Sequence, residues 1–538
     1  MGKGVKRAEA PAVAVLLMLL AAQALWAARD KAPTADELAH QVASGYSHLV
    51  RRDFRMIPAS PPLPRLLSAL PLLATGVKAP FDHPSWEAGN GPEFARQFFY
   101  HSGADADTLI FLARLPIIAL SVLFAPAVYF WTRRLWGAAA GLAALALYAF
   151  NPDLIAHSAL ATADLAVALF FFLTLRSFWA YLRTPSPRGA LVTGALTGAA
   201  LLSKFSGLLL FPVLLVAWAF SGRVRQTRAG HFALFFLAAF LTIWAGYFFE
   251  TKPLLERTPD PAKKAAVYEK IGGHSLLEFA QKVPVPLSTF ASAVVSMAYT
   301  RAQGTNAFLL GEWSREGWWY YYFIAFGVKN TIPFLILSLL GWALLARRPE
   351  RLTAAVLWAP VVLFFILTLK DKAQAGIRYF LPIYPLFCMA GGYAALRLAG
   401  RERALGLAAV ALLVWHAGES LAVAPHHLAY FNEWAGGPKN GFRVLRDSNL
   451  DWGQDLKGLA ETARKKNYPE IVLFYPWPAS PDYYKIAYRP FRSEEFEYPD
   501  RAVYAVSAHC IDAVKWAKGR RPDAMVGYSI FVYDMRNA

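Results

Sequence analysis

Long apolar runs alternate with polar segments along the whole chain. Each run is close to the length that crosses the hydrocarbon core of a bilayer, roughly 20 residues. Only three of the polar segments are long, at residues 29–107, 250–319 and 425–538. The apolar runs predict eleven membrane-spanning helices at 10–28, 108–132, 135–151, 162–182, 189–203, 206–222, 230–249, 320–346, 352–369, 379–398 and 404–424.

Lysine and arginine gather in six short clusters between these runs. With eleven spans and a cytoplasmic N terminus, all six clusters fall on the cytoplasmic side, as the positive-inside rule requires. We therefore predict a multi-pass protein of a bacterial inner (plasma) membrane, with its C terminus and its three long polar segments outside. The clusters are Lys3/Lys6/Arg7, Arg133/Arg134, Arg183/Arg188, Arg223/Arg225/Arg228, Arg347/Arg348/Arg351 and Arg397/Arg401/Arg403.

Composition agrees with a protein whose partner is the lipid bilayer. Of the 538 residues, 56% are apolar and 17% are charged, against roughly 45–50% and about 25% in soluble domains. A net charge of +18 suggests nucleic-acid binding in a soluble protein. Because the basic residues follow the predicted topology, we predict no nucleic-acid partner. The first apolar run also fits a cleavable signal peptide, but its length favours a retained helix.

The long polar segments divide the chain into two predicted domains. Residues 1–424 form a membrane domain with outer loops 29–107 and 250–319, the first opening on a helix that Thr34 and Glu37 cap together. Residues 425–538 are polar enough to form a small soluble α/β domain outside the membrane. Its predicted elements are a helix at 456–465 and strands at 471–475, 502–507 and 526–533.

Acidic residues at the outer membrane boundary are candidates for catalysis, because a charge is costly there unless it is paired or hydrated. Asp36 and Glu37 follow the first span, and Asp164 lies at the start of a later one, seven residues after His157. A carboxylate at the mouth of a membrane cavity can accept a proton from an attacking hydroxyl. Two alternatives stay open: an acidic pair at a helix N terminus, and for Asp164 a polar contact between helices.

Basic residues on the outer side oppose the positive-inside bias and need another explanation. Lys204, Lys329 and Arg378 are the main ones. An anionic head group would explain them, since arginine clamps phosphate oxygens with two parallel hydrogen bonds. The alternative is ion pairing with nearby acids, namely Glu250, Glu312 or Asp371.

The segment from Asp447 to Asp455 holds three acids in nine residues. Oxygen ligands at such density can bind a cation, but the spacing is not that of an EF-hand loop, and a turn followed by a helix cap is favoured. The chain has two cysteines and no phosphate-binding loop, dinucleotide fingerprint or zinc-protease motif. We predict no metal and no cofactor.

Several motifs occur in one order and together carry a resemblance. They are Asp36-Glu37, Pro61-Pro62-Leu63, Asn151-Pro152 leading to His157 and Asp164, the run Leu202 to Gly207, the run Lys329 to Pro333, the run Arg378 to Pro385, and the run Asp447 to Asp455. This series resembles the bacterial phospholipid-carrier-dependent glycosyltransferases. They form the protein O-mannosyltransferase and aminoarabinose-transferase-like group, with the membrane GT-C fold. The resemblance covers nearly the whole chain.

The resemblance implies an inverting sugar transfer outside the membrane. The donor would be a polyprenyl-phosphate sugar, and the acceptor a hydroxyl of a protein, lipid or glycan. Asp36 would be the base, supported by Glu37, with Asp164 as a second acid. Donor phosphate would face Lys204, Lys329 and Arg378, while His40, His157 and Asp451 would support the site or the acceptor. Ser60 departs from the family pattern, which often has a charged residue or histidine before Pro-Pro, and Arg65 is a possible replacement.

A secondary transporter or lipid flippase is the alternative function. Such proteins place charged sites near the bilayer midplane, on broken helices. Here the candidate acids lie at the outer boundary and the outer loops are large, which favours surface chemistry. A non-catalytic assembly factor is a further alternative, and it would lack a shared site for these residues.

Overall fold

Helices run through most of the computed structural model, which describes residues 3–57, 60–256, 261–347 and 350–536. Within those ranges, seven helical segments are long and apolar enough to cross a membrane. They include α1 (Lys3–Asp30), α6 (Ala106–Trp136), α9 (Asp164–Arg183), α12 (Ala229–Gly246), α17 (Arg351–Thr368), η5 (Ile377–Ile383) continued by α18 (Tyr384–Ala399), and α19 (Arg403–Val423).

Two further predicted spans are broken helices. Helices α7 (Ala138–Ala149) and α8 (Pro152–Ser158) meet at 63°, and α15 (Tyr321–Lys329) and α16 (Ile332–Leu345) meet at 119°. A proline lies in the first turn of the helix after each break, where its missing N–H leaves no hydrogen bond unmade. Asn151 and Thr331 then cap the new helices through their side chains. The span predicted at 320–346 therefore consists of two helices with a sharp bend between them.

The last two predicted spans are also helical, although each is shorter than the others. They are α10 (Pro187–Ser203), and η3 (Phe205–Leu209) continued by α11 (Leu210–Phe220). A helix thus lies at every predicted run, and nine of the eleven pass the length test when each broken pair counts once. The prediction of a polytopic helical membrane protein is confirmed.

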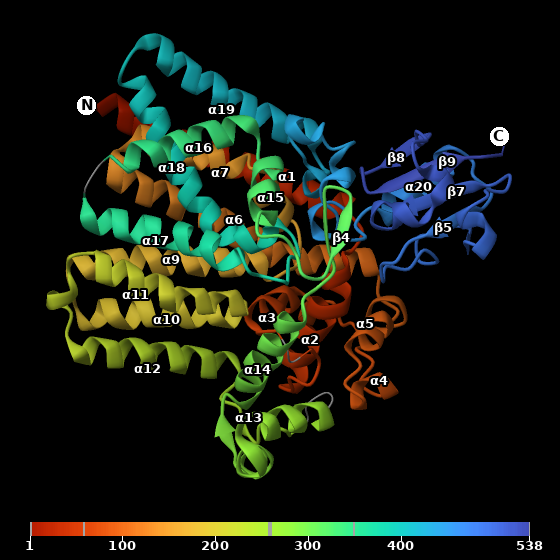
Figure 1. The fold of residues 1–538 in the computed structure, drawn as a ribbon, viewed down its shortest axis with the longest axis horizontal. Coiled ribbons are helices and arrows are strands. Elements are labelled where there is room, and N and C mark those ends of the chain that lie inside the picture. The colour runs from red at the N-terminus through yellow and green to blue at the C-terminus, as the bar shows by residue number, and fades with distance from the viewer. Residues whose placement is uncertain (1–2, 58–59, 257–260, 348–349, 537–538) are drawn as a thin grey trace.

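The helix bundle has two distinct ends (Figure 1). The turns between α6 and α7, α9 and α10, α11 and α12, α16 and α17, and α18 and α19 lie at the end where α1 begins. These turns carry the predicted basic clusters, so we call it the basic end. The side chains of Lys3, Lys6 and Arg7, and Arg348, lie outside the described residues. The C-terminal sheet lies at the opposite end, which we call the sheet end.

The first two long polar segments form short elements at the sheet end. Half of the predicted cap is present, because the backbone N–H of Thr34 donates to the Glu37 carboxylate at 2.9 Å, but the Thr34 hydroxyl donates to the same carboxylate instead of accepting from the helix backbone. Their elements are η1 (Glu37–Gln41, a π-helix), α2 (Val42–Arg51), α3 (Leu63–Ala69), η2 (Leu70–Ala74), α4 (Pro84–Glu87), α5 (Gly91–Tyr100), β1 (Thr251–Lys252), α13 (Pro261–Lys282), β2 (Val285–Pro286), α14 (Ser288–Gln303), β3 (Ala307–Leu309) and β4 (Glu312–Ser314). A further short turn, η4 (Val224–Gln226), lies between α11 and α12 at the basic end.

The C-terminal segment contains the predicted α/β unit. Helix α20 (Leu456–Lys465) packs with a mixed sheet of order β6-β5-β7-β9-β8. The predicted strand at 526–533 is divided, because Gly527 and Tyr528 turn the chain with positive φ angles. The strands are β5 (Ile471–Phe474), β6 (Tyr488–Pro490), β7 (Val503–Ser507), β8 (Ala524–Val526) and β9 (Ile530–Asp534), and the short turns are η6 (His427–Ala429), η7 (Glu433–Ala435), η8 (Gly441–Arg443), η9 (Asp447–Asn449), η10 (Ser493–Phe496), η11 (Ala508–Ala513) and η12 (Lys515–Ala517).

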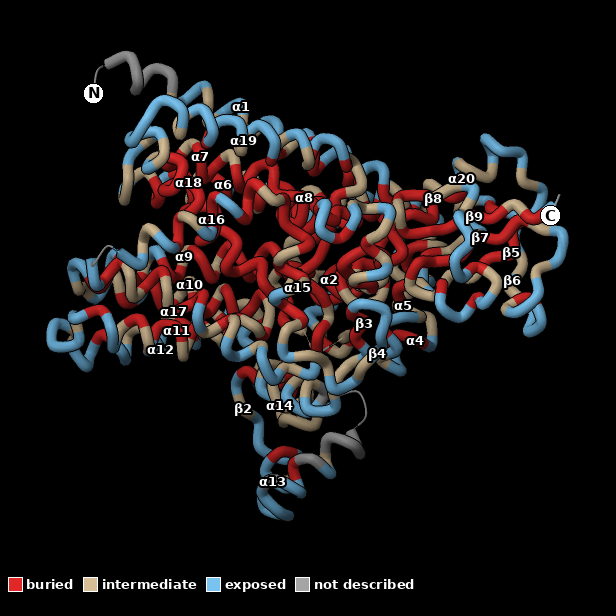
Figure 2. Tube along the Cα trace, turned by 45° about the horizontal axis from the view of Figure 1, so that its top comes forward, coloured by how far each residue is buried: buried red, intermediate tan, exposed pale blue. Residues whose placement is uncertain are grey.

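One continuous core joins the spans to the sheet end. Buried backbone runs from the helices into the C-terminal unit (Figure 2). Phe431 and Leu450 share the core of the spans, whereas Leu456 and Val503 pack with Phe98 from the first outer segment. The connecting residues 425–455 therefore lie between the spans and the sheet, where they can contribute to a site.

Candidate active site

Four of the predicted site residues meet at the sheet end of the bundle. Asp36 follows α1, Asp164 is the first residue of α9, Lys204 follows α10, and Arg378 lies in η5. Arg378 Nη1 donates to Asp36 Oδ2 at 2.8 Å and lies 3.9 Å from Asp164 Oδ2. Lys204 Nζ donates to Asp164 Oδ1 at 2.5 Å. We call these four residues the charged cluster.

The two acids of the cluster differ in accessibility. The Asp36 side chain is 26% exposed, whereas that of Asp164 is 2% exposed and has a cation near each oxygen. Asp36 is thus the carboxylate that a substrate hydroxyl can approach. The Arg378 guanidinium also contacts an aromatic ring, because it lies 4.3 Å from the ring centre of Trp452. Such contacts favour a cation through the ring quadrupole.

Several buried polar atoms around the cluster have no hydrogen-bond partner in the described residues. Buried polar groups in proteins are almost always paired, so this concentration marks a region suited to a polar ligand. His40 belongs to it and lies within electrostatic reach of Asp36 and Arg378, while burial lowers the pKa of its imidazole. The atoms are His40 Nδ1, Arg65 Nε and Nη2, both ring nitrogens of His157, and Thr162 Oγ1.

Arg65, named above as a possible replacement for the charged residue that the family often has before Pro-Pro, lies near the charged cluster. Its side chain is fully buried, and Nη1 donates to the carbonyl oxygen of Ile57 at 2.8 Å. Burial lowers the pKa of Arg65 to about 10, so it is still a cation at neutral pH. Among the described residues no carboxylate pairs with it, although Asp36 contributes to its electrostatic environment. Arg65 therefore offers free N–H donors beside the charged cluster.

Glu37 lies in a different environment from Asp36. Its fully buried carboxylate accepts from Arg114 Nε at 2.8 Å and from Nη2 at 2.7 Å. Thr34 also donates to it, as does the backbone N–H of Ala161. With its lone pairs occupied, Glu37 is not a candidate base. It ties the segment that carries Asp36 to the loop before Asp164, so it holds the two acids of the cluster relative to one another.

Lys329 does not join the charged cluster. Its ammonium is fully buried and donates to three carbonyl oxygens, those of Leu428, Tyr430 and Asn449, at 2.8–2.9 Å. Asp153 lies 3.6 Å away. Because all three N–H bonds of Lys329 are occupied, we no longer assign it to donor phosphate. It anchors the 428–449 segment to the broken helix.

The acidic motif at 447–455 forms a turn, as the favoured interpretation predicted, but the helix cap expected after it is not formed, because the Asp455 side chain makes no capping hydrogen bond to α20. Buried Asp451 accepts from Ser507 Oγ and from the backbone N–H groups of Gly453 and His509. Burial raises the pKa of Asp451 to about 7. His157 is on helix α8 rather than in a loop, with its ring 6.4 Å from that of Trp452. No group of three potential metal ligands occurs within the described residues.

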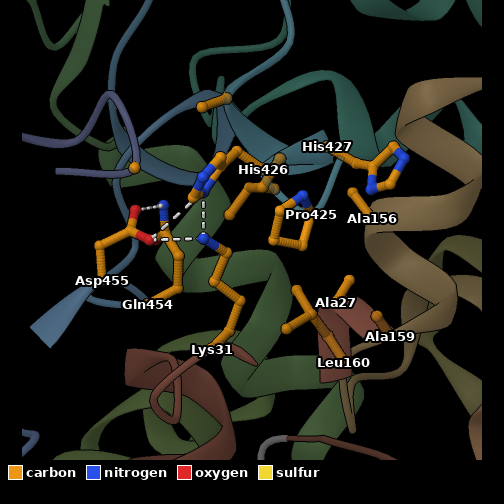
Figure 3. Close-up of a pocket in the computed structure, with 13 residues that line it drawn as sticks. Ala27, Lys31, Ala156, Ala159, Leu160, Pro425, His426, His427, Gln454 and Asp455 are labelled. Carbon is orange, nitrogen blue, oxygen red and sulfur yellow. Dashed lines mark hydrogen bonds and ion pairs between the residues drawn. The ribbon is translucent and has the colours of Figure 1, made fainter. Parts of the chain in front are cut away.

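The segment that carries Asp36 is held by the C-terminal part of the chain (Figure 3). Ala32 N donates to Gln454 O and Ala35 N to Trp452 O, each at 2.9 Å. Lys31 Nζ donates to Asp455 Oδ1 at 2.7 Å and also to His426 Nδ1. This joint, formed by Lys31, His426 and Asp455, connects α1, the linker after α19 and the C-terminal unit.

The joint should weaken as pH falls. Accepting a hydrogen bond from Lys31 requires neutral His426, and burial together with Lys31 lowers the pKa of His426 below its usual ~6.5. The joint's contribution to stability is therefore full above about pH 6.5 and is lost as pH falls through the lowered pKa. His426→Gln keeps an acceptor at every pH, so its melting temperature should fall less between pH 7.5 and 5.5. Equal losses in both proteins would contradict this assignment.

Comparison with known proteins shows that one family matches part of the chain. Residues 106–245 match the family described as dolichyl-phosphate-mannose-protein mannosyltransferase. The match begins with α6 and ends near the end of α12. Over that segment it confirms the resemblance that the sequence motifs indicated. No curated protein sequence matches the chain.

Two solved structures resemble the chain at low identity. ArnT from Cupriavidus metallidurans, bound to undecaprenyl phosphate, is 14% identical, with a TM-score of 0.49, and the alignment covers 96% of this chain and 97% of ArnT. The oligosaccharyltransferase of Archaeoglobus fulgidus is 13% identical, with a TM-score of 0.44, and the alignment covers 93% of this chain and 63% of that protein.

Proposed function

We propose that this protein transfers a sugar from a polyprenyl-phosphate donor to an acceptor hydroxyl, with inversion at the anomeric carbon. The observation that carries the proposal is the charged cluster, where one accessible carboxylate adjoins two cations and the free N–H groups of Arg65. The family match at residues 106–245 supports the same class of donor. The acceptor would belong to a protein, a lipid or a glycan.

The chemistry follows from the charges. The acceptor oxygen attacks the anomeric carbon as the bond from that carbon to the phosphate oxygen breaks, and the electron pair of that bond stays on the phosphate. Arg378, Lys204 and Arg65 would stabilise the phosphate charge, which is the usual role of preorganised donors at a leaving group. Asp36 would take the acceptor proton. One displacement of this kind inverts the configuration, and the phosphate needs no separate carboxylic acid to leave.

Arg378 would link the two halves of this reaction. It donates to Asp36 and lies near Asp164 in the structure. Phosphate bound at its remaining N–H groups would lie beside the base without contacting it. The two acids and three cations leave one positive charge in excess, which suits an anionic donor.

The broken helices are the feature that this structure shares with transporters, since transporters coordinate substrates at such breaks. Here the breaks meet at Asp153 and Lys329, and the hydrogen bonds of Lys329 are all used within the protein. The free N–H groups of Arg65 lie instead near the charged cluster, at the sheet end of the bundle. This placement favours surface chemistry over passage through the bundle.

We also propose that the sheet end faces outward from a bacterial inner membrane and that the N terminus is cytoplasmic. The support is the position of the basic clusters, which share one end of the bundle (Figure 1). A reporter fused to the C terminus should be active only outside the cytoplasm. A cytoplasmic signal there would reverse this orientation.

Changes at Arg378 should weaken donor binding. Arg378→Ala should cost about 1–3 kcal/mol of binding free energy, typical of hydrogen bonds to a charged group. Arg378→Lys should restore only part, because an ammonium cannot reproduce the planar fork of guanidinium. Undecaprenyl phosphate is a suitable probe, measured with purified protein in detergent. Lys372→Gln is the control, because Lys372 pairs with Glu316 on the exposed surface. Unchanged affinity in both Arg378 variants would remove Arg378 from the phosphate site.

A further inference from the structure

A cavity lies among helices α9 to α12, far from the charged cluster. These four helices lie side by side (Figure 1), and the cavity between them has a volume of about 140 Å³. We call it the distal cavity. Nearly all of its lining is apolar: Phe178, Tyr181, Ala190, Thr193, Phe211, Leu214, Leu215, Trp218, His231, Phe232, Phe235 and Phe236.

Apart from Thr193 and the indole of Trp218, the polar groups of the lining are those of Tyr181 and His231. A hydrogen bond of 3.0 Å joins Tyr181 Oη and His231 Nδ1. Both residues lie within about one helical turn of the basic end, since Tyr181 is two residues before Arg183 and His231 is three residues after Arg228. The cavity thus changes from apolar to polar toward the basic end.

Five arginines lie at the basic ends of the same four helices, the end toward which Tyr181 and His231 lie. They have no acidic neighbours in sequence, because residues 165–249 include no aspartate or glutamate. Across the described part of the chain, none of the five forms an ion pair with a carboxylate; the nearest polar contact is from Arg223 to Gln226. We call this set the arginine rim, and it consists of Arg183, Arg188, Arg223, Arg225 and Arg228.

We propose that the distal cavity and the arginine rim bind one anionic phospholipid of the surrounding membrane. The lipid phosphate would contact the rim, and one acyl chain would lie among the phenylalanine and leucine side chains. Charge complementarity carries this choice, because an unpaired cationic rim above an apolar cavity matches an anionic head group on a hydrocarbon chain. Tyr181 and His231 lie between the two regions, where a lipid has its polar ester groups.

The glycosyl donor is not the expected occupant. Its phosphate belongs to the charged cluster, where Asp164 begins α9, whereas Arg183 ends that helix. At ~1.5 Å per residue, 19 residues separate the two ends by about 29 Å. The inference therefore stands independently of the proposed reaction.

The positive-inside rule explains basic residues at this end but does not explain a cavity beneath them. Arg401 and Arg403 provide the matched comparison, because they are exposed at the basic end of α19 and line neither this cavity nor the rim. If topology were the whole explanation, removal of either set should affect lipid binding equally.

Lipid binding to the purified full-length protein tests the proposal. Retention of phosphatidylglycerol and of phosphatidylcholine with the same acyl chains is measured by native mass spectrometry at several salt concentrations. We expect selective retention of phosphatidylglycerol, weakened by salt. The Arg183→Gln/Arg188→Gln/Arg228→Gln variant should lose affinity about fivefold per arginine, from ~1 kcal/mol for each cation.

Two tryptophan variants distinguish lipid binding in the distal cavity from general contact with the bilayer. Leu215→Trp should displace the acyl chain, because Leu215 lines the cavity and is 61% exposed, which lets the larger ring be accommodated. Val410→Trp, on an exposed face of α19, is its control. Equal retention of the two lipids, equal losses in the Arg401→Gln/Arg403→Gln control, or competition by undecaprenyl phosphate would overturn the proposal. Unchanged melting temperatures show that the variants are folded.

Discussion

Asp36→Asn should reduce sugar transfer by about 10²–10⁴-fold, the usual contribution of a general base. The amide keeps the size of the side chain and can still accept a hydrogen bond from Arg378, but it cannot take a proton near neutral pH. Binding of undecaprenyl phosphate should persist, because Arg378, Lys204 and Arg65 would hold the phosphate. Transfer and binding are measured on the same purified preparation in detergent.

The control for this variant is Asp82→Asn, since Asp82 is an exposed acid of the same outer segment. It should transfer sugar at the normal rate. Near-normal turnover by folded Asp36→Asn would place the base elsewhere. If binding fell in step with turnover, Asp36 would instead hold the donor or the local structure.

Removing Arg114 should have the largest effect on stability. Arg114 donates to both oxygens of Glu37 and to the carbonyl oxygens of Ala28, Lys31 and Ala32. Arg114→Met would leave the buried Glu37 carboxylate without its charge partner, and breaking a buried pair in this way costs about 3–5 kcal/mol. Unfolding in detergent, followed by denaturant or heat, measures that loss. Transfer should fall as well, since the segment that carries Asp36 loses its support.

Arg65→Met is the matched comparison, because Arg65 is equally buried but has only one hydrogen bond to the described residues. Its buried cation is poorly compensated, so methionine should change the free energy of unfolding by about 1 kcal/mol or less. Donor affinity should nevertheless decrease. Equal destabilisation by the two substitutions would contradict the distinction between a structural and a ligand-binding arginine.

The sequence pattern predicted the spans well because bilayer crossing imposes a length and an apolar composition that are visible in one dimension. It also located α20 and strands β5 and β7, whose periodicity is regular. The bends at Asn151 and Asn330 were missed. Their proline and capping signals are local, and the apolar runs on both sides continue through them.

The charged cluster was predictable in part. The sequence argument identified its four residues, because a charge at a membrane boundary is costly unless it is paired or hydrated. They are Asp36, Asp164, Lys204 and Arg378. The same argument cannot tell a charge with a partner inside the protein from one with a partner outside. Glu37 and Lys329 turned out to be the former, since their partners, Arg114 and three carbonyl groups, come from distant parts of the chain.

The contacts between residues 31–36 and 452–455 can form only late in the synthesis of these segments. Asp36 leaves the ribosome some 420 residues before Trp452, Gln454 and Asp455, which hold the segment of Asp36 and contact the Arg378 guanidinium. All the spans precede these partners. A growing chain can therefore insert its helices while the contacts around the charged cluster are still incomplete, and these contacts form only when residues 452–455 have folded back onto residues 31–36.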